Sequence, residues 1–174
     1  MTDDNTASSS GDTSNGETSN GETTDKPFTT PPKWLIPWIS KAHVAAYKLT
    51  SGKVGADLAG KPGILLRTIG RKSGNVHTVC LPYVPDGDAM VVVASFAGAD
   101  HHPAWYHNIK AAGEVLVRDR DRVFWATAEV VEGEARPTLW QKVIDDSPWY
   151  AEYQEKTTRQ IPMLRLIYDR PYAG

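Results

Sequence analysis

The stretch EVLVRDRDRVFWATAEVVE, residues 114–132, holds two apolar runs on either side of a short charged connection. Val, Phe, Trp and Thr are enriched in strands, and RDRD at residues 118–121 has the length of a hairpin turn. Strands joined by so short a connection pair antiparallel. This stretch predicts a β-hairpin and a mainly antiparallel sheet.

Four more apolar runs, each bounded by turn residues, extend the same pattern. They are GILLRTI at 63–69, VHTVCLPYV at 76–84, AMVVVAS at 89–95 and IPMLRLI at 161–167. Asp86-Gly87 is a strong turn dipeptide, so it again favours an antiparallel connection. Six such strands with few helices, in roughly 110 residues, favour a small closed barrel over a βαβ sheet.

Two helices interrupt the strands. PAWYHNIKAAG, residues 103–113, begins at a proline and ends at Gly113. We expect Trp105 to anchor this helix in the core, while Asn108 faces a cleft. ARPTLWQKVID, residues 135–145, places Leu139 over Val143 at helical spacing.

A third helix is predicted near the N-terminus. Its expected apolar face consists of Trp38, Ile39, Ala42, Ala45, Ala46 and Leu49. Two interpretations stay open. The helix packs on the domain, or its Trp and Lys residues dock it on a membrane surface or a partner.

The first 26 residues carry almost no aliphatic side chains and six acids against one base. Such a segment buries too little apolar area to offset its ordering entropy, so we expect a disordered tail, followed by a single domain at residues 27–174. That domain holds 18 basic and 15 acidic side chains, too weak an excess for a nucleic-acid binder.

Cys80 is the single cysteine of the 174 residues, which excludes an internal disulfide and a multi-cysteine metal site. A reducing cytoplasm is the expected location. No secretory signal pattern and no run of 18 apolar residues is present, so neither export by that route nor a membrane span is expected.

The motif GRKSG, residues 70–74, places Arg71, Lys72 and Ser73 in a turn between two glycines. Exposed backbone N–H groups and cations could hold a phosphate or carboxylate there. A solvated surface turn is the competing interpretation. His77 follows on the next strand, where a contact with backbone and a contact with ligand are equally compatible with its position.

ADHHPAWYHN, residues 99–108, suggests a metal site, but adjacent histidines rarely reach one ion, so no metal is expected. SPWYAEYQ, residues 147–154, puts Tyr150 and Tyr153 on one helical face, which fits either core packing or an apolar ligand. No Ser/His/Asp or Cys/His set is evident. If the protein is an enzyme, a cofactor supplies the chemistry.

Taken in order, GRKSG, PDGD, VVVAS, HPAWYHN, YAEYQ and TTRQIPMLRL resemble the deazaflavin (F420)-dependent nitroreductase family of actinobacteria, over residues 34–168. The resemblance implies a six-stranded split β-barrel with flanking helices, related to flavin-binding barrels. It also implies coenzyme F420, an 8-hydroxy-5-deazaflavin with an anionic tail, and hydride transfer from its reduced form to a quinone, enone or nitroaromatic acceptor.

The resemblance also implies site residues. Arg71, Lys72 and Ser73 contact the anionic portion of the coenzyme. The deazaflavin groove is lined by His77, Thr78, Val79, Cys80, Leu81, Pro82, Val93, Ala94, Ser95, Phe96, Ala104, Trp105, Tyr106, His107, Asn108 and Tyr150. Trp149, Tyr150 and Tyr153 shape the substrate pocket, and Tyr150, Tyr153 or Ser95 orients the acceptor.

Two departures and two alternatives accompany the resemblance. Family members commonly carry Arg at the position of His77 and Pro at that of Cys80. An FMN-dependent reductase of the same fold and a non-catalytic barrel that binds a coenzyme or lipid stay open. The expected partner is a small-molecule acceptor, with peripheral membrane contact through the N-terminal helix left open, and the expected assembly is a monomer or homodimer.

Overall fold

The computed structural model describes residues 36–50, 52–53, 57–58 and 60–173. In this part of the chain eight strands form one sheet. They are β1 (Asp57–Leu58), β2 (Lys61–Ile69), β3 (Val76–Pro82), β4 (Val84–Asp86), β5 (Ala89–Val93), β6 (Glu114–Asp119), β7 (Arg122–Val130) and β8 (Met163–Pro171). Each of the six predicted runs lies on a strand. The second run divides at Tyr83 into β3 and β4, and the two-residue β1 is too short to show a pattern.

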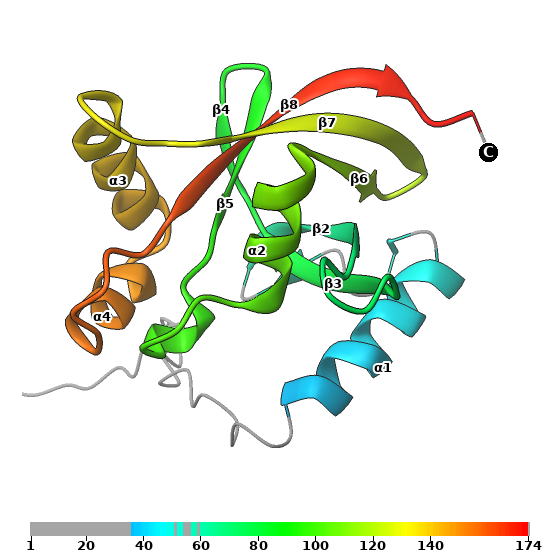
Figure 1. Ribbon diagram of the computed structural model, residues 1–174, viewed down its shortest axis with the longest axis horizontal. Coiled ribbons are helices and arrows are strands. Elements are labelled where there is room, and N and C mark those ends of the chain that lie inside the picture. The colour runs from blue at the N-terminus through cyan, green and yellow to red at the C-terminus, as the bar shows by residue number, and fades with distance from the viewer. Residues whose placement is uncertain (1–35, 51, 54–56, 59, 174) are drawn as a thin grey trace, which may run out of the picture.

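The strands pair antiparallel along the path β3-β2-β6-β7-β8-β5-β4, with β1 on β2. The two ends of this path are consecutive in the chain, since only Tyr83 separates β3 from β4. The Tyr83 N–H donates to the Pro62 carbonyl at 3.1 Å, which holds this junction against β2. The sheet therefore curls into the predicted split β-barrel (Figure 1).

Helices flank the sheet. They are α1 (Ile36–Leu49), the 3₁₀ turn η1 (Phe96–Gly98), α2 (Ala104–Ala112), α3 (Ala135–Asp146) and α4 (Trp149–Glu155). Gly113 ends α2 in the left-handed conformation, φ 75°, where its N–H donates to the Ile109 carbonyl. This is the helix end that the sequence predicts, because glycine adopts positive φ without steric cost.

Two large clusters make the core. Helix α2 packs Trp105, Tyr106 and Ile109 against apolar side chains of β2, β5, β6, β7 and β8. The second cluster joins β4 and β5 to α3 and α4, and includes Tyr150 and Tyr153. Trp105 is 9% exposed, so its predicted anchoring role is confirmed.

The predicted apolar face of α1 is wrong at Ala42, Ala45 and Leu49, Ala46 is half-buried, and the side chains of Trp38 and Ile39 lie outside the described residues. Among the described side chains of α1, Val44 and Tyr47 are buried, and they pack on Leu65 of β2 beside Cys80. Ala42 and Ala45 are exposed, and Leu49 is 86% exposed. The hydroxyl of Tyr47 explains the choice of face, because it donates to the Gly63 carbonyl at 3.2 Å and accepts the Arg120 N–H at 2.7 Å. Burial of a phenol that finds such partners outweighs burial of alanines.

The predicted tail, residues 1–26, lies outside the described residues. Among the residues that the structure describes, no helix is long and apolar enough to cross a membrane.

Candidate anion-binding groove

A groove of about 440 Å³ lies where the GRKSG turn meets η1 and α2. Its lining comes from two stretches of the sequence, 70–77 and 96–108: Gly70, Arg71, Lys72, Ser73, His77, Phe96, His101, His102, Ala104, His107 and Asn108. The GRKSG turn predicted as a possible anion site therefore forms one wall of the groove. The loop before α2 and the first turns of that helix form the opposite side.

The GRKSG turn is held by backbone bonds and by α2. The Gly74 N–H donates to the Gly70 carbonyl at 2.7 Å, and the Gly70 N–H donates to the Asn75 carbonyl at 2.8 Å. The Arg71 N–H donates to Oδ1 of Asn108 at 3.1 Å. The turn is thus fixed in place before any ligand arrives, which lowers the entropic cost of binding.

Gly70 allows a close approach of two polar side chains. A Cβ at this position would lie 2.5 Å from Oγ of Ser73 and 3.0 Å from Nε2 of His77. Both atoms lie at the ends of side chains, so a larger residue would be accommodated by moving the hydroxyl or the imidazole away from its present place. Glycine here brings both polar groups onto the same wall.

The lining of the groove makes it a candidate anion site. Its lining holds Arg71, Lys72 and four histidines, and no carboxylate belongs to the lining residues. Cationic and N–H donors around one hollow favour phosphate and carboxylate groups through charge-assisted hydrogen bonds. Among the described residues, no group of three or more His, Cys, Asp or Glu is arranged to hold a metal ion.

The loop on the far side of the groove has an uncommon backbone. Phe96 (φ 48°) and Ala97 (φ 53°) adopt left-handed conformations that L-residues rarely take, followed by Gly98 at φ 78°. The Phe96 ring is 43% exposed, lines the groove and contacts the His101 ring edge-on at 5.1 Å. Strained residues of this kind cluster at functional sites, where surrounding structure holds them.

His102 and His107 are the half-buried histidines of the groove, and His102 has the shifted pKa. Its ring lies 4.8 Å from Tyr106 and 5.7 Å from His107, centroid to centroid. Burial lowers the pKa of His102, and the neighbouring Arg159, His107, Lys110 and His101 lower it further. The imidazole is therefore held neutral.

The structure brings eight of the predicted site residues together in this groove: Arg71, Lys72, Ser73, His77, Phe96, Ala104, His107 and Asn108. Sequence reasoning weighed His101 and His102 only as metal ligands and missed their place beside the turn. A cluster of histidines directly before a helix was the available signal. Their convergence with residues of β3 could not be seen without the fold.

Most side chains of β3 do not line the groove. Val79 and Leu81 pack on the main core cluster, and Cys80 faces α1 in the cluster with Tyr47. Thr78 and Pro82 are half-buried and do not line the groove. Side chains alternate across a strand, so the whole stretch from 77 to 82 cannot face one ligand.

The remaining predicted residues also lie outside the groove lining. Val93, Ala94, Trp105 and Tyr106 are buried, the last two in α2. Ser95 is 8% exposed at the start of η1. Tyr150 is 5% and Tyr153 8% exposed, within the cluster under α3 and α4, and Trp149 packs against that cluster.

Burial also raises the pKa of Tyr150, so its phenol stays protonated. The ring centroids of Tyr150 and Tyr153 are 6.2 Å apart. Their surroundings are those of core residues, which leaves their catalytic role a prediction.

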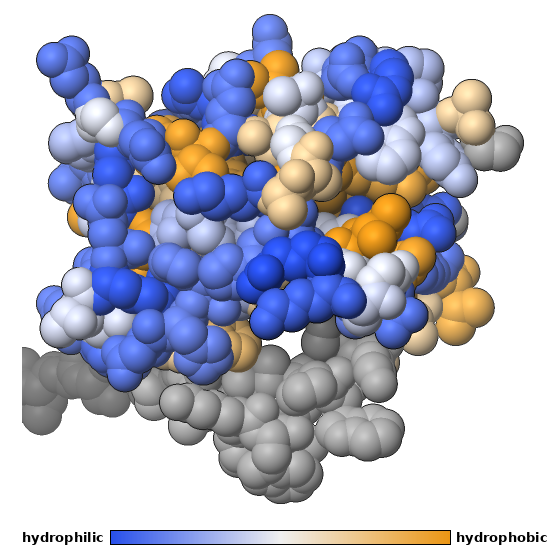
Figure 2. Space-filling view, in the orientation of Figure 1, coloured by the Kyte–Doolittle hydropathy of each residue, from blue (hydrophilic) through white to orange (hydrophobic). Residues whose placement is uncertain are grey.

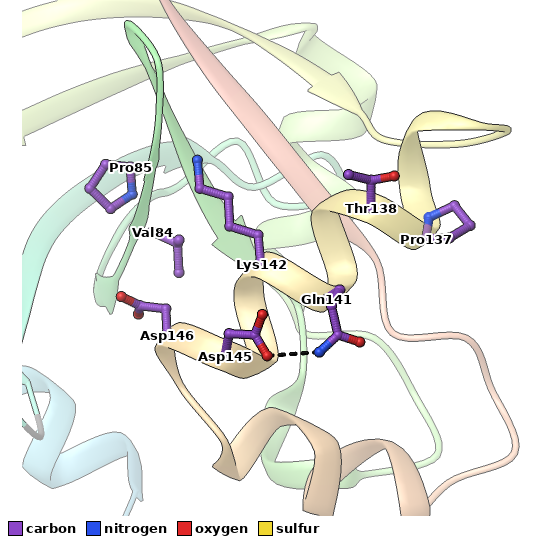
Figure 3. A pocket seen from close by; sticks show the side chains of 8 residues that line it. All are labelled: Val84, Pro85, Pro137, Thr138, Gln141, Lys142, Asp145 and Asp146. Carbon is purple, nitrogen blue, oxygen red and sulfur yellow. Dashed lines mark hydrogen bonds between the residues drawn. The ribbon is translucent and has the colours of Figure 1, made fainter.

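A larger hollow, about 960 Å³, lies between β4 and α3 (Figure 3). Its charged lining residues are Asp145, Asp146 and Lys142. The Lys142 ammonium already contacts Asp86 at 3.0 Å, and Gln141 donates to Asp145 at 2.7 Å. Two carboxylates against one paired lysine disfavour an anionic ligand, so this larger hollow is a poorer candidate than the groove.

A third hollow, about 760 Å³, lies beside α3 and α4 and contains Arg136 and Trp140. Arg136 donates to the Ile161 carbonyl at 2.8 Å and lies over the Trp140 ring.

The apolar surface on the face seen in Figure 2 is broken into separate patches among hydrophilic side chains. The groove is the hollow in which cations and histidines converge.

The fold is a split barrel, and the groove beside the GRKSG turn is its candidate anion site. A family model described as F420H(2)-dependent quinone reductase matches residues 38–167. The F420H(2)-dependent quinone reductase Rv1261c of Mycobacterium tuberculosis is 38% identical over 132 residues, which cover 72% of this chain and 87% of that protein. A second relative from that organism, the putative F420H(2)-dependent quinone reductase Rv3178, is 32% identical over 108 residues, with 60% and 88% covered.

Two solved structures are similar. One is described as an F420-H2 dependent reductase, FDR-A, with 42% identity, a TM-score of 0.55 and coverage of 60% of this chain and 93% of the other. The second is described as a domain-swapped dimer, with 36% identity, a TM-score of 0.57 and coverage of 75% and 98%.

The chain belongs to the F420H(2)-dependent quinone reductase family. The predicted family, the split barrel, the oxidoreductase class and coenzyme F420 are confirmed. Reduction of quinones with F420H2 is the supported reaction, and the FMN-dependent and non-catalytic alternatives are not favoured.

Proposed function

We propose that this protein reduces quinones with F420H2 and that the groove beside the GRKSG turn holds the anionic portion of the coenzyme. The observation that carries the proposal is the convergence of Arg71, Lys72 and four histidines around a hollow whose lining has no carboxylate. A strongly anionic coenzyme needs such a wall. The lining fits this coenzyme because Arg71, Lys72 and the histidines are hydrogen-bond donors suited to anionic groups.

The bound coenzyme would supply a hydride from its reduced deazaflavin ring. The chain contributes binding and orientation. Arg71 and Lys72 neutralise negative charge, and the preset turn limits the entropy lost on binding. The exposed Phe96 ring offers an apolar surface at the edge of the groove, suited to a flat ring system.

A quinone takes up one hydride and one proton to become a hydroquinone. Ser95, Tyr150, Tyr153 and Trp149 stay the proposed acceptor-side residues, and enones and nitroaromatics stay proposed acceptors. The phenol of Tyr150 is protonated, so it is suited to donating a hydrogen bond rather than accepting a proton. Water is a sufficient proton source.

The experiment is oxidation of F420H2 by menadione in the presence of the purified protein. We expect a rate proportional to protein concentration, and no protein-dependent rate above the uncatalysed reaction when reduced FMN replaces F420H2. Tight F420 binding without turnover on any quinone would contradict the proposed reaction. Faster turnover with reduced FMN would contradict the proposed coenzyme.

The proposal also covers the location of the protein, its contact with membranes and its assembly. A cytoplasmic location rests on the single, half-buried Cys80. Peripheral membrane contact through α1 is supported by exposed Ala42, Ala45 and Leu49, which recur at i, i+3 and i+7. Sedimentation with anionic lipid vesicles tests this, with Leu49→Glu as the variant that should remain in the supernatant.

A homodimer is supported by the similar structure described as a domain-swapped dimer. Light scattering after size-exclusion chromatography measures the mass directly. A mass of one 19.1 kDa chain at micromolar concentration would contradict it.

A further inference from the structure

Arg159 follows α4 and binds the loop on the far side of the groove at several points. Its Nη2 donates to the carbonyls of Ala94 and Ser95 at 3.2 and 2.7 Å, and its Nε donates to the Ala99 carbonyl at 2.7 Å. Its Nη1 lies 3.0 Å from Nδ1 of His102. One half-buried guanidinium thus spans the segment that carries η1 and its left-handed residues.

The contact with His102 determines where the imidazole proton sits. A guanidinium has only donors and stays charged in proteins, so Nδ1 of His102 must offer its lone pair. A neutral imidazole that accepts at Nδ1 carries its hydrogen on Nε2. Protonation of the ring would place an Nδ1–H against the Arg159 N–H and break this bond.

The groups around His102 also disfavour a positive charge on its ring beside the charged Arg159 guanidinium. Arg159 after α4, His101 in the same loop, and His107 and Lys110 on α2 are the groups that bear on the His102 ring, together with the Tyr106 ring. The nearest acid in the loop, Asp100, accepts a hydrogen bond from Thr157 at 3.0 Å. The neutral form of His102 therefore persists at physiological pH.

We infer that Arg159 is a positioning residue for the F420-dependent reaction, because it fixes His102 as the Nε2–H tautomer and so presents a neutral hydrogen-bond donor in the groove. This inference rests on the proposed function, in which the groove holds the coenzyme. A neutral imidazole donates a hydrogen bond but is too weak an acid to give up its proton. His102 is accordingly a binding group and not the proton source.

The first test needs no coenzyme. Two-bond ¹H–¹⁵N correlation spectra of the ligand-free protein at neutral pH report which ring nitrogen of His102 is protonated. We expect Nε2–H with an unprotonated Nδ1 in the wild type, and a tautomer mixture or a charged ring in Arg159→Met. An Nδ1–H tautomer in the wild type would overturn the inference, even if the variant failed to fold.

The matched control is Arg136→Met. Arg136 also donates to a backbone carbonyl near α4, that of Ile161, but it lines a different hollow. We expect its His102 spectrum to match the wild type. An unchanged His102 tautomer in folded Arg159→Met would show that something other than Arg159 fixes the ring, and would overturn the inference.

The second test couples the two residues through F420 affinity. His102→Leu should weaken binding about 10-fold, since it removes one donor to an anion, and Arg159→Met should weaken it to the extent that the spectrum shows loss of the Nε2–H tautomer. In the double variant the losses should not add, because both act through the same Nε2–H. Additive losses would contradict the positioning role. If menadione assays instead show no F420H2 oxidation, the proposed function fails while the tautomer result stands independently.

Discussion

The side-chain oxygen of Asn108 accepts a hydrogen bond from the backbone N–H of Arg71 at 3.1 Å, and so ties the GRKSG turn to α2. Asn108 is 7% exposed, and its amide nitrogen donates to Oγ1 of Thr68 at 3.2 Å. A side chain on a core helix thereby sets the position of a charged surface turn. The candidate anion site is therefore anchored on the barrel as well as on the turn.

Asn108→Leu should release the turn and leave the Arg71 N–H and the Thr68 hydroxyl without their partner. We expect the free energy of unfolding to fall by about 1 to 3 kcal/mol and F420 affinity to fall with it. Thr68→Val is the matched control, since it removes one bond to Asn108 but leaves the Arg71 bond. Equal losses of affinity in both variants would argue against the tie between turn and helix.

Gly98→Ala should destabilise the protein by about 1 to 3 kcal/mol. Gly98 has φ 78°, and a Cβ there would lie 2.8 Å from the Tyr153 carbonyl oxygen on the backbone of α4. Gly133 has φ 62° and open space around it, so Gly133→Ala carries the backbone cost alone, about 1 kcal/mol. Denaturant unfolding of both variants measures the difference. Equal losses of unfolding free energy in the two variants would mean that η1 and α4 can move apart at little energetic cost.

The contribution of His102 to stability should depend on pH. Its pKa in the folded protein lies below the ordinary value of 6.5, so the unfolded chain takes up the proton first as the pH falls. The stabilisation is complete above about pH 6.5 and is lost below it. The difference in unfolding free energy between wild type and His102→Gln should therefore shrink between pH 7.5 and 5.5. A difference that grew at low pH would mean that His102 is bound as a cation.

Cys80 should resist thiol reagents in the folded protein. Burial raises the pKa of this thiol to about 12, so the thiolate fraction at pH 8 is on the order of 10⁻⁴. We expect no labelling by iodoacetamide within an hour at pH 8, and complete labelling after unfolding in urea. Rapid labelling of the native protein would place the thiol in contact with solvent.

Tyr153→Phe separates a core role from a catalytic one. As a proposed acceptor-side residue, Tyr153 should lose about 10-fold or more of kcat/KM for menadione in this variant, at unchanged F420 affinity. Its 8% exposure and its place in the core cluster define the contrary outcome, which is lower thermal stability with kcat/KM changed less than about 3-fold. Both quantities are measured on the same preparation.

The strands could be predicted because each is a short apolar run bounded by turn residues, a property of local sequence. The end of α2 at Gly113 could be predicted for the same reason, since only local backbone geometry decides it. The buried face of α1 could not be predicted. It depends on partners for the Tyr47 hydroxyl at Gly63 and Arg120, which lie 16 and 73 residues away.

The candidate site was predicted in part. Arg71 and Lys72 could be predicted because they are two adjacent cations between glycines. The role inferred for His102 could not, because it depends on a contact with Arg159, 57 residues later in the chain. The prediction that residues 77–82 line one groove followed the family motif and overlooked strand alternation, which turns Cys80 toward α1. Long-range contacts of this kind are absent from any local pattern.

The central claim is that the turn binds the anionic portion of F420, and its most direct measurement is the F420 dissociation constant of the double variant Arg71→Ala/Lys72→Ala at low ionic strength. Loss of two charge-assisted contacts should weaken binding by about 2 to 5 kcal/mol. Melting temperature should change little, because both side chains are exposed. Lys48→Ala/Lys53→Ala removes two exposed charges outside the groove and should bind F420 as the wild type does. Wild-type affinity in the Arg71/Lys72 variant would contradict the account.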